Sequence, residues 1–320
     1  MIMSESETIQ SYLQREKGLK SQSAADNKRY AVNGLQKGME EVGIDSLTDV
    51  TPTDIESYMS HMSNEGYSPK TIDIRYTLLK SVFDYLSERE NLIDESPFEP
   101  LEYSDFSSIM NGTKKENTTK EKITYVTPEQ VDKIVDHLSA PKLRNELIVR
   151  LMFQTGMREI EANTTRIDDV DREERSVKIH GKGSKNRTVY YQPSLDILLS
   201  QWIDGGYRAS NQAAQSSDNL FITNTSEQLS RGRISRIIKN AAKDAGINEV
   251  MYVDQNGRER WKYTAHSLRH GHAVEALKSG IDVRTVQKHL GHASLEQTMK
   301  YLRLVEDDVR KSYQRFGSSD

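Results

Sequence analysis

Residues 176–191 read S-V-K-I-H-G-K-G-S-K-N-R-T-V-Y-Y. Two runs within this stretch, 176–180 and 187–191, alternate apolar and polar side chains, and a glycine-rich segment, 181–186, joins them. Alternation with a period of two places successive side chains on opposite faces of a strand, and a short loop that contains glycine closes a hairpin. The stretch therefore predicts an antiparallel β-hairpin that carries Lys182 in its loop.

Helical patterns surround this hairpin on both sides. Thr127-Pro128 predicts the start of a helix over 128–138, and a strongly apolar helix follows through 147–153 until Gly156 ends it. Downstream we expect a helix over 195–202, a short strand at 220–222 and several helices to the end of the chain. The expected fold class is therefore mainly α (α+β), with one small antiparallel sheet.

The first hundred residues predict a separate bundle of four helices. Apolar residues recur at helical spacing within 5–17 and 23–42, and two further helices begin at Thr51-Pro52 and Ser68-Pro69, where a capping hydroxyl precedes a proline. Because 320 residues exceed a comfortable single core, two domains are expected. We predict an N-terminal domain over 1–97, a basic linker over 98–124 and a C-terminal domain over 125–320.

Composition restricts the class of protein further. The chain has no cysteine, so disulfides and thiolate metal sites are excluded. We find no apolar run long enough to span a bilayer and no secretory leader. The expectation is a cytoplasmic protein without a membrane partner.

The net charge and the local distribution of charge point to different conclusions about nucleic-acid binding. The net charge of −4 and the pI of about 6.1 do not by themselves predict a nucleic-acid binder. Lysines and arginines nevertheless cluster within 182–187, 231–239 and 258–262. Each cluster taken alone fits a solvated surface as well as it fits phosphate contacts.

Four short motifs carry the chemistry. They are T-G-M-R at 155–158, H-S-L-R-H at 266–270, L-G-H ending at His292, and Tyr301. Arginine is permanently charged and binds phosphate oxygens through two parallel hydrogen bonds, so Arg158 and Arg269 suit a phosphodiester. A tyrosine is ionised only to roughly 0.1% at neutral pH, so Tyr301 needs a base or strong charge neutralisation to act as a nucleophile.

The order of these residues resembles the tyrosine recombinases of the phage integrase and Xer class, from about residue 5 to the C-terminal tail. The resemblance implies that Tyr301 attacks DNA, that Lys182 is the general acid with Lys185 as the alternative, and that Glu161 orients Arg158. It also implies an N-terminal core-binding (SAM-like) domain. The expected catalytic residues are Arg158, Lys182, His266, Arg269, His292 and Tyr301, and the expected DNA contacts are Lys185, Arg187, Arg231 and Arg233.

The resemblance also sets the reaction and the partners. A 3′-phosphotyrosyl ester conserves the energy of the phosphodiester, so strand exchange at a double-stranded recombination site requires no cofactor. The tail, with Val305, Val309, Tyr313 and Phe316 on one side, would dock on a neighbouring copy and build a homo-tetramer on DNA.

The sequence is also compatible with a metal site and with two other classes of protein. His266 and His270 are four residues apart and could hold a metal ion, but no H-E-x-x-H motif and no cysteine supports one, so no metal site is expected. A topoisomerase or resolvase would use the same tyrosine chemistry. A non-catalytic helix-turn-helix regulator is the third possibility, because Gly280 to Leu290 with its flanking helices resembles that motif.

Overall fold

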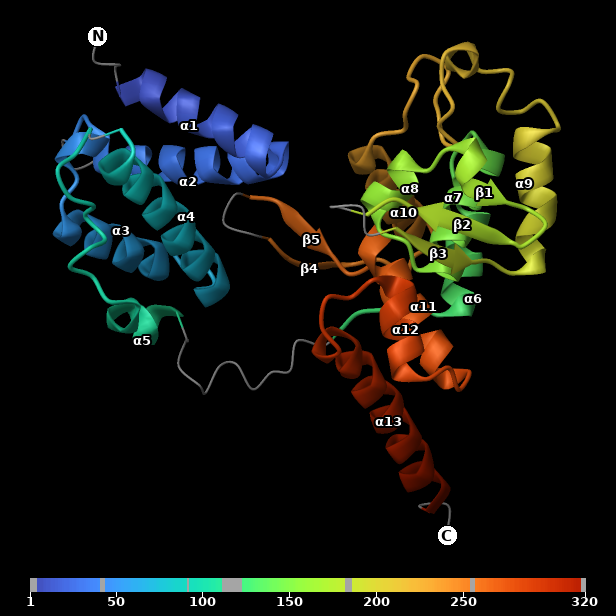
Figure 1. Ribbon diagram of the computed structural model, residues 1–320. Coiled ribbons are helices and arrows are strands. Elements are labelled where there is room, and N and C mark those ends of the chain that lie inside the picture. The colour runs from blue at the N-terminus through green and yellow to red at the C-terminus, as the bar shows by residue number, and fades with distance from the viewer. Residues whose placement is uncertain are drawn as a thin grey trace. The chain divides into compact units, whose positions relative to one another are not determined.

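The structure is a computed structural model that describes residues 5–40, 44–90, 92–110, 123–181, 186–253 and 257–317. The chain divides into two compact units, Met1–Glu121 and Lys122–Asp320 (Figure 1). Each unit has a hydrophobic core of its own. Within the described residues, no helix combines the length and the apolar character that crossing a bilayer requires.

The first unit is a helical bundle, as predicted. Thr51 accepts a hydrogen bond from the backbone of Asp54, whose carboxylate accepts one from the backbone of Thr51, and Pro52 follows at the first helical position. Ser68 caps the next helix in a similar way. The helices are α1 (Glu5–Leu19), α2 (Gln22–Glu40), α3 (Pro52–Asn64), α4 (Pro69–Glu88) and the short α5 (Ser107–Met110).

The boundary of this unit differs from the one expected at residue 97. Phe98, Phe106 and Met110 are buried in the core of the first unit, and Tyr76 packs against Phe98 with the ring centroids 5.1 Å apart. Residues 98–110 are therefore part of the folded unit and not of a linker. Their apolar side chains are too widely spaced to show a helical period, which is why the sequence did not reveal them. Residues 111–122 lie outside the described part of the chain.

The second unit is mostly helical, also as predicted. Its helices are α6 (Pro128–Asp136), α7 (Lys142–Thr155), α8 (Glu159–Thr164), α9 (Asp196–Ile203), α10 (Arg231–Asp244), α11 (Ala265–Lys278), α12 (Val283–Leu290) and α13 (Glu296–Gly317). Its strands are β1 (Val170–Asp171), β2 (Ser176–Ile179), β3 (Arg187–Tyr190), β4 (Val250–Val253) and β5 (Glu259–Trp261).

The predicted hairpin is confirmed in β2 and β3. The two strands pair antiparallel, with Val177 opposite Val189 and Ile179 opposite Arg187, and β1 adds a third strand beside β2. Val177, Ile179 and Val189 are buried, as the alternation required. The loop residues 182–185 lie outside the described residues.

One expected strand is absent, and one two-stranded ribbon was not expected. The run 220–222 forms no regular strand; its three side chains are fully buried instead, and Trp202 donates a hydrogen bond to the Leu220 carbonyl. A short apolar run cannot be distinguished by its pattern from any other buried segment. Conversely, the β4–β5 ribbon was not predicted, although Asn256-Gly257 is a recognised hairpin turn sequence.

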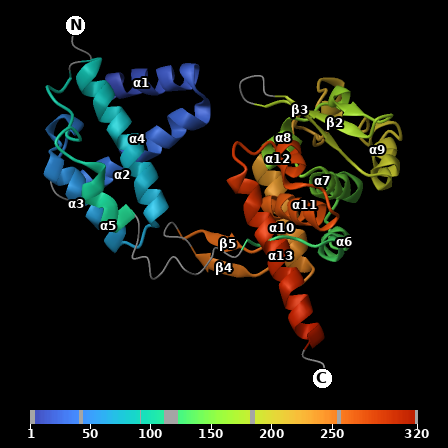
Figure 2. The ribbon, with the colours of Figure 1, turned by 60° about the horizontal axis from the view of Figure 1, so that its bottom comes forward.

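Packing around α11 positions the candidate site. This helix contacts α7, α12 and α13, and in both ribbon views it lies at the centre of the second unit (Figures 1 and 2). Tyr301 of α13 belongs to a small core with Val274 of α11 and Leu290 of α12. The motifs at 155–158, 266–270, 292 and 301 are thereby brought into one region.

Candidate active site

Arg158 is positioned by the turn that ends α7. Gly156 adopts a left-handed conformation there (φ 62°), and a Cβ atom at this position would lie 2.6 Å from both His272 and Leu290. Only glycine meets both conditions. The chain then turns so that Arg158 becomes the N-cap of α8, with its guanidinium donating to Glu161 at 3.0 Å and to the Gly291 carbonyl at 3.2 Å.

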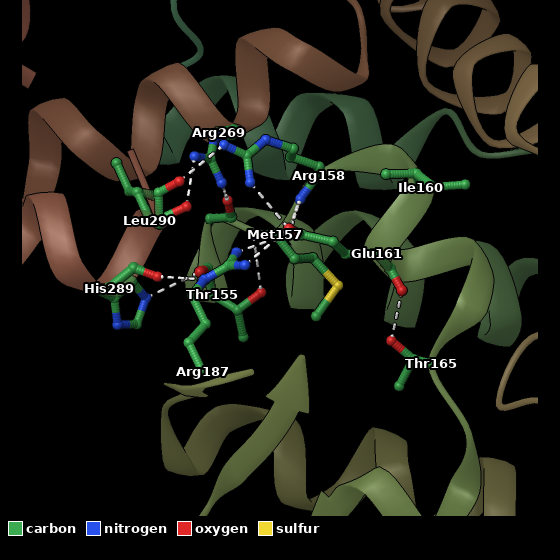
Figure 3. Close-up of polar contacts among 12 residues, drawn as sticks. Thr155, Met157, Arg158, Ile160, Glu161, Thr165, Arg187, Arg269, His289 and Leu290 are labelled. Carbon is green, nitrogen blue, oxygen red and sulfur yellow. Dashed lines mark hydrogen bonds and ion pairs between the residues drawn. The ribbon is translucent and has the colours of Figure 1, made fainter. Parts of the chain in front are cut away.

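Glu161 is the anchor for two arginines (Figure 3). Arg187 donates to both of its carboxylate oxygens, at 2.8 and 2.7 Å, and the Arg158 backbone N–H donates at 2.7 Å. Burial alone would raise the pKa of Glu161, but these hydrogen bonds and the charges of Arg187 and Arg158 outweigh it and lower the pKa to about 2. Glu161 is therefore ionised throughout the physiological range.

Arg187 occupies a different place from the one expected of a DNA contact. Its side chain is only 14% exposed, and besides the pair with Glu161 its Nε donates to the His289 carbonyl at 2.7 Å. It thus connects β3, α8 and α12. Its Nε and both terminal nitrogens donate to groups of the protein itself.

Arg269 is the buried arginine of the site. It is 2% exposed and donates to the carbonyls of Gly156 at 2.6 Å and Leu290 at 2.7 Å (Figure 3). Burial, and then the nearby charge of Arg158, lower its pKa to about 10, so it remains protonated at neutral pH. The guanidinium groups of Arg158, Arg187 and Arg269 surround the single carboxylate of Glu161. This excess of positive charge favours binding of an anion.

The histidines and Tyr301 lie next to these cations. His266 is exposed in the first turn of α11, and its ring meets that of His270 edge to face at 4.3 Å. His270 Nδ1 lies 2.6 Å from the Tyr301 hydroxyl. Tyr301 is 2% exposed, and burial raises its pKa to about 12 although Arg269 and Arg158 oppose the shift.

His292 stacks near the same tyrosine. The two rings are 6.2 Å apart and inclined by 21°, and His292 Nδ1 lies 2.9 Å from the hydroxyl of the buried Thr298. Burial, followed by the charges of Arg269 and Arg158, lowers the pKa of His292 to about 4. The ring is therefore neutral at pH 7.

Of the expected catalytic residues, Arg158, His266, Arg269, His292 and Tyr301 come together in this region. Lys182 and Lys185 lie outside the described residues, although Arg187, at the end of their loop, contacts Glu161. Arg231 and Arg233 are exposed at the start of α10, which contacts α8. No group of three or more potential metal ligands occurs in the described part of the chain.

Sequence reasoning missed two contacts of the site. His270 was considered only as a possible metal ligand, although it follows Arg269 directly on α11 and meets Tyr301. Thr298, which lies beside His292, was not singled out. The spacing within α11 shows which residues share a helix, but it does not show which of them meets a residue on α13.

The arrangement defines a class of protein that binds a phosphate ester between arginines and presents a tyrosine to it. The profile of the phage integrase family matches residues 124–307, more than half of the chain, and the N-terminal SAM-like domain of phage integrases matches residues 9–90. The chain belongs to the phage integrase family.

Similar proteins extend along nearly the whole chain. Tyrosine recombinase XerC of Anoxybacillus flavithermus is 26% identical over 303 residues, covering 94% of this chain and 93% of that protein. Tyrosine recombinase XerA of Pyrococcus furiosus is 27% identical over 263 residues, covering 81% and 85%. The crystal structure of XerH recombinase bound to palindromic difH substrate, a post-cleavage complex, matches with a TM-score of 0.70 at 19% identity, covering 98% and 85%. The last likeness shows a shared fold.

Proposed function

We propose that this chain is a site-specific DNA recombinase that cuts and rejoins DNA through a 3′-phosphotyrosyl bond to Tyr301. Membership in the phage integrase family and the Xer recombinases among its relatives support the class of reaction. One observation supports the assignment of the nucleophile: the Tyr301 hydroxyl lies where the charges of Arg269 and Arg158 act on it. A DNA substrate would place the protein in the cytoplasm.

The arginines would bind the phosphate. Attack on phosphorus concentrates negative charge on the two non-bridging oxygens, and preorganised guanidinium groups stabilise that charge. The carbonyls of Gly156 and Leu290 hold Arg269 in place, and Glu161 holds Arg158. Neither arginine would therefore have to reorganise greatly when DNA binds.

The remaining roles follow by resemblance. His292 would donate a hydrogen bond to the phosphate from Nε2, with the Thr298 hydroxyl bonded to Nδ1. Lys182 would protonate the departing 5′-oxygen. Because β2 ends at Ile179 and β3 begins at Arg187, the loop that carries Lys182 ends beside Glu161.

Contacts with flanking DNA would come from α10. Arg231 and Arg233 are exposed in its first turn, and the charge of Arg231 acts on Glu159, the neighbour of Arg158 in the chain. Phosphates on either side of the cleaved bond would meet these arginines.

Assembly into a tetramer would use α13. Its Val309 is 51% exposed, whereas the side chains of Tyr313 and Phe316 lie outside the described residues. The second unit also has a pocket of about 510 Å³ between β3, α11 and α12, lined in part by Tyr190, Ala276, Ile281 and Val286. In both ribbon views the far end of α13 extends away from its unit (Figures 1 and 2). We infer that the tail of one copy occupies this pocket of the next.

The variant Tyr301→Phe tests the proposed nucleophile. It removes the attacking oxygen and keeps the buried ring, so covalent attachment to DNA should disappear while binding persists. Denaturing gels of protein incubated with total DNA measure attachment, and gel shifts measure binding. Tyr207→Phe, at a tyrosine that is 58% exposed, is the control. Undiminished attachment of the Tyr301→Phe protein would refute the assignment.

A further inference from the structure

The Tyr301 hydroxyl is already engaged by a histidine in the absence of DNA. His270 Nδ1 lies 2.6 Å from it, and the two ring centroids are 5.4 Å apart. His266, one of the catalytic residues expected by resemblance, is exposed and contacts the His270 ring rather than the phenol. Within the described part of the chain, the Tyr301 hydroxyl thus forms its hydrogen bond with His270.

The surroundings of His270 keep its ring neutral, which allows Nδ1 to accept this hydrogen bond. The charged and titratable groups that act on it are His266 and Arg269 from α11, Lys300 from α13 and His292 from the segment between α12 and α13. Burial first, and then these groups, lower the pKa of His270 to about 3, so its ring is neutral at pH 7. In the tautomer that carries its proton on Nε2, which the inference below requires, Nδ1 accepts and the phenol donates.

We propose that His270 is the general base that removes the proton from Tyr301 during DNA cleavage. This inference rests on Tyr301 being the nucleophile, as proposed above. As the Tyr301 oxygen forms its bond to phosphorus, its proton moves to His270 Nδ1, and the bond from phosphorus to the 5′-oxygen breaks. The departing oxygen takes its proton from the general acid. In rejoining, His270 returns the proton to the tyrosine oxygen.

Two features make this transfer feasible. The charge of Arg269 acts on both His270 and the Tyr301 hydroxyl, so a hydroxyl that moves toward a phosphate bound by Arg269 stays close to the imidazole. The bound phosphate also brings negative charge next to Arg269 and Lys300, whose positive charges otherwise disfavour the imidazolium. Binding of DNA therefore makes His270 a stronger base at the moment when the proton must leave.

Comparison of His270→Ala with His270→Asn distinguishes two roles of His270. It either takes up the tyrosine proton as a base or only positions the tyrosine. The Asn side chain has an oxygen near the position of Nδ1 and accepts the same hydrogen bond, but it does not take up a proton at neutral pH. The substrate is a nicked duplex built from the DNA that wild-type protein traps covalently. Single-turnover cleavage is measured for both variants, with and without added imidazole.

A general base predicts that both variants cleave at least about 100-fold more slowly than wild type, and that imidazole partly restores His270→Ala. The control is His137→Asn, where the native ring is exposed and contacts the Lys133 carbonyl and not Tyr301; it should cleave within a few-fold of wild type. Thermal melting follows folding, and if the Ala protein does not fold, the Asn protein decides.

Two results would overturn the inference. Wild-type cleavage by His270→Asn would reduce His270 to a positioning residue, and faster cleavage by His270→Ala would make the contact a restraint on the tyrosine. The Tyr301→Phe protein is measured in the same assay. If it still becomes attached to DNA, the proposed nucleophile fails; if it does not, and the His270 variants cleave normally, only the assignment of the base fails.

Discussion

Arg187 lies beside the loop of Lys182 and Lys185, and its guanidinium binds groups of the protein itself. Its guanidinium binds Glu161 through two hydrogen bonds and the His289 carbonyl through a third. Sequence placed it in a basic cluster with Lys182 and Lys185, where the charge pattern is the same for a phosphate contact and for an ion pair. Only the position of Glu161, 26 residues away in the chain, distinguishes the two.

Replacing Arg187 by alanine should therefore destabilise the fold. It leaves the Glu161 carboxylate, which is 8% exposed, without its main partner, and breaking a buried pair in this way costs about 3–5 kcal/mol. Arg231→Ala is the matched change at an exposed arginine and should alter the free energy of unfolding by less than about 0.5 kcal/mol. Urea denaturation measures both.

The effects of the two substitutions on DNA affinity should have the opposite order, with the larger loss in Arg231→Ala. Arg231→Ala should weaken binding and lower its salt dependence, because one phosphate contact is lost. Equal stability of the two variants would mean that Arg187 does not hold the site together.

Much of the candidate site could nevertheless be predicted from the sequence. Arg158, His266, Arg269, His292 and Tyr301 belong to short motifs whose residue types suit phosphate chemistry, and the structure brings them into one region. The pairing of Tyr301 with His270 was not predictable, because α12 separates their two helices in the chain and the contact depends on how α13 packs on α11.

Among the secondary-structure elements, the turn between α7 and α8 determines the position of the arginines. Gly156 provides the left-handed residue there, and its carbonyl accepts a hydrogen bond from Arg269. Both the position of the Arg269 guanidinium and the start of α8 depend on this single residue.

Gly156→Ala should be more damaging than the same change at a free turn. The positive φ alone costs about 1–2 kcal/mol, and the new methyl group would clash with His272 and Leu290. At Gly206, which has φ +80° and no atom within 4 Å of the added Cβ, only the backbone cost applies. Thermal melting should show Gly156→Ala at least twice as destabilising in free energy, and equal losses would contradict the packing described.

The histidines of α11 and of the turn after α12 should make the fold sensitive to acid. Burial first, and then nearby charges, lower the pKa values of His270 and His272 to about 3 and that of His292 to about 4. The unfolded chain binds protons near pH 6.5 and the folded chain does not. Stability should therefore be complete above pH 6.5 and decrease as the pH falls toward 4.

Each of these histidines contributes up to about 1.4 kcal/mol per pH unit within that window. Urea denaturation at pH 7.5 and 5.5 measures the change. Below about pH 4.5 protonation of Glu161 would add a further loss, because its pKa is also lowered in the folded state. A free energy of unfolding that stays constant from pH 7.5 to 5.5 would contradict the burial of these rings.

The secondary elements themselves were predicted where their pattern was regular. The β2–β3 hairpin alternates cleanly, and Thr51 and Ser68 mark helix starts with proline after them. The β4–β5 ribbon escaped because its strand Val250–Val253 is exposed along its whole length and shows no alternation of burial. Residues 98–110 escaped because their packing on α4 is a tertiary effect.

At the scale of the whole molecule, the proposed assembly links the tail of one copy to a pocket in the next. Val309 on α13 and Ile281 at the pocket are 51% and 45% exposed, so an aspartate at either position should leave the stability of a single copy nearly unchanged. Each change should reduce tetramer formation on DNA and strand exchange by at least about tenfold, because a buried charge without a partner is costly.

A variant that carries aspartate at both Val309 and Ile281 tests whether the two single variants lose assembly for the same reason. If Val309 and Ile281 meet across copies, the second substitution adds little to the first. Analytical ultracentrifugation on DNA measures assembly. Fully additive losses, or normal tetramers from either single variant, would exclude this mode of docking.

The proposed cleavage and strand exchange both require Tyr301 to be the residue that becomes joined to DNA. Mass spectrometry of the trapped complex, after nuclease and trypsin digestion, identifies that residue directly. Cleavage after Lys300 and Arg303 releases the tripeptide 301–303, which should carry a nucleotide through its 3′-phosphate. A nucleotide attached to another tyrosine, or joined through its 5′-phosphate, would contradict the account.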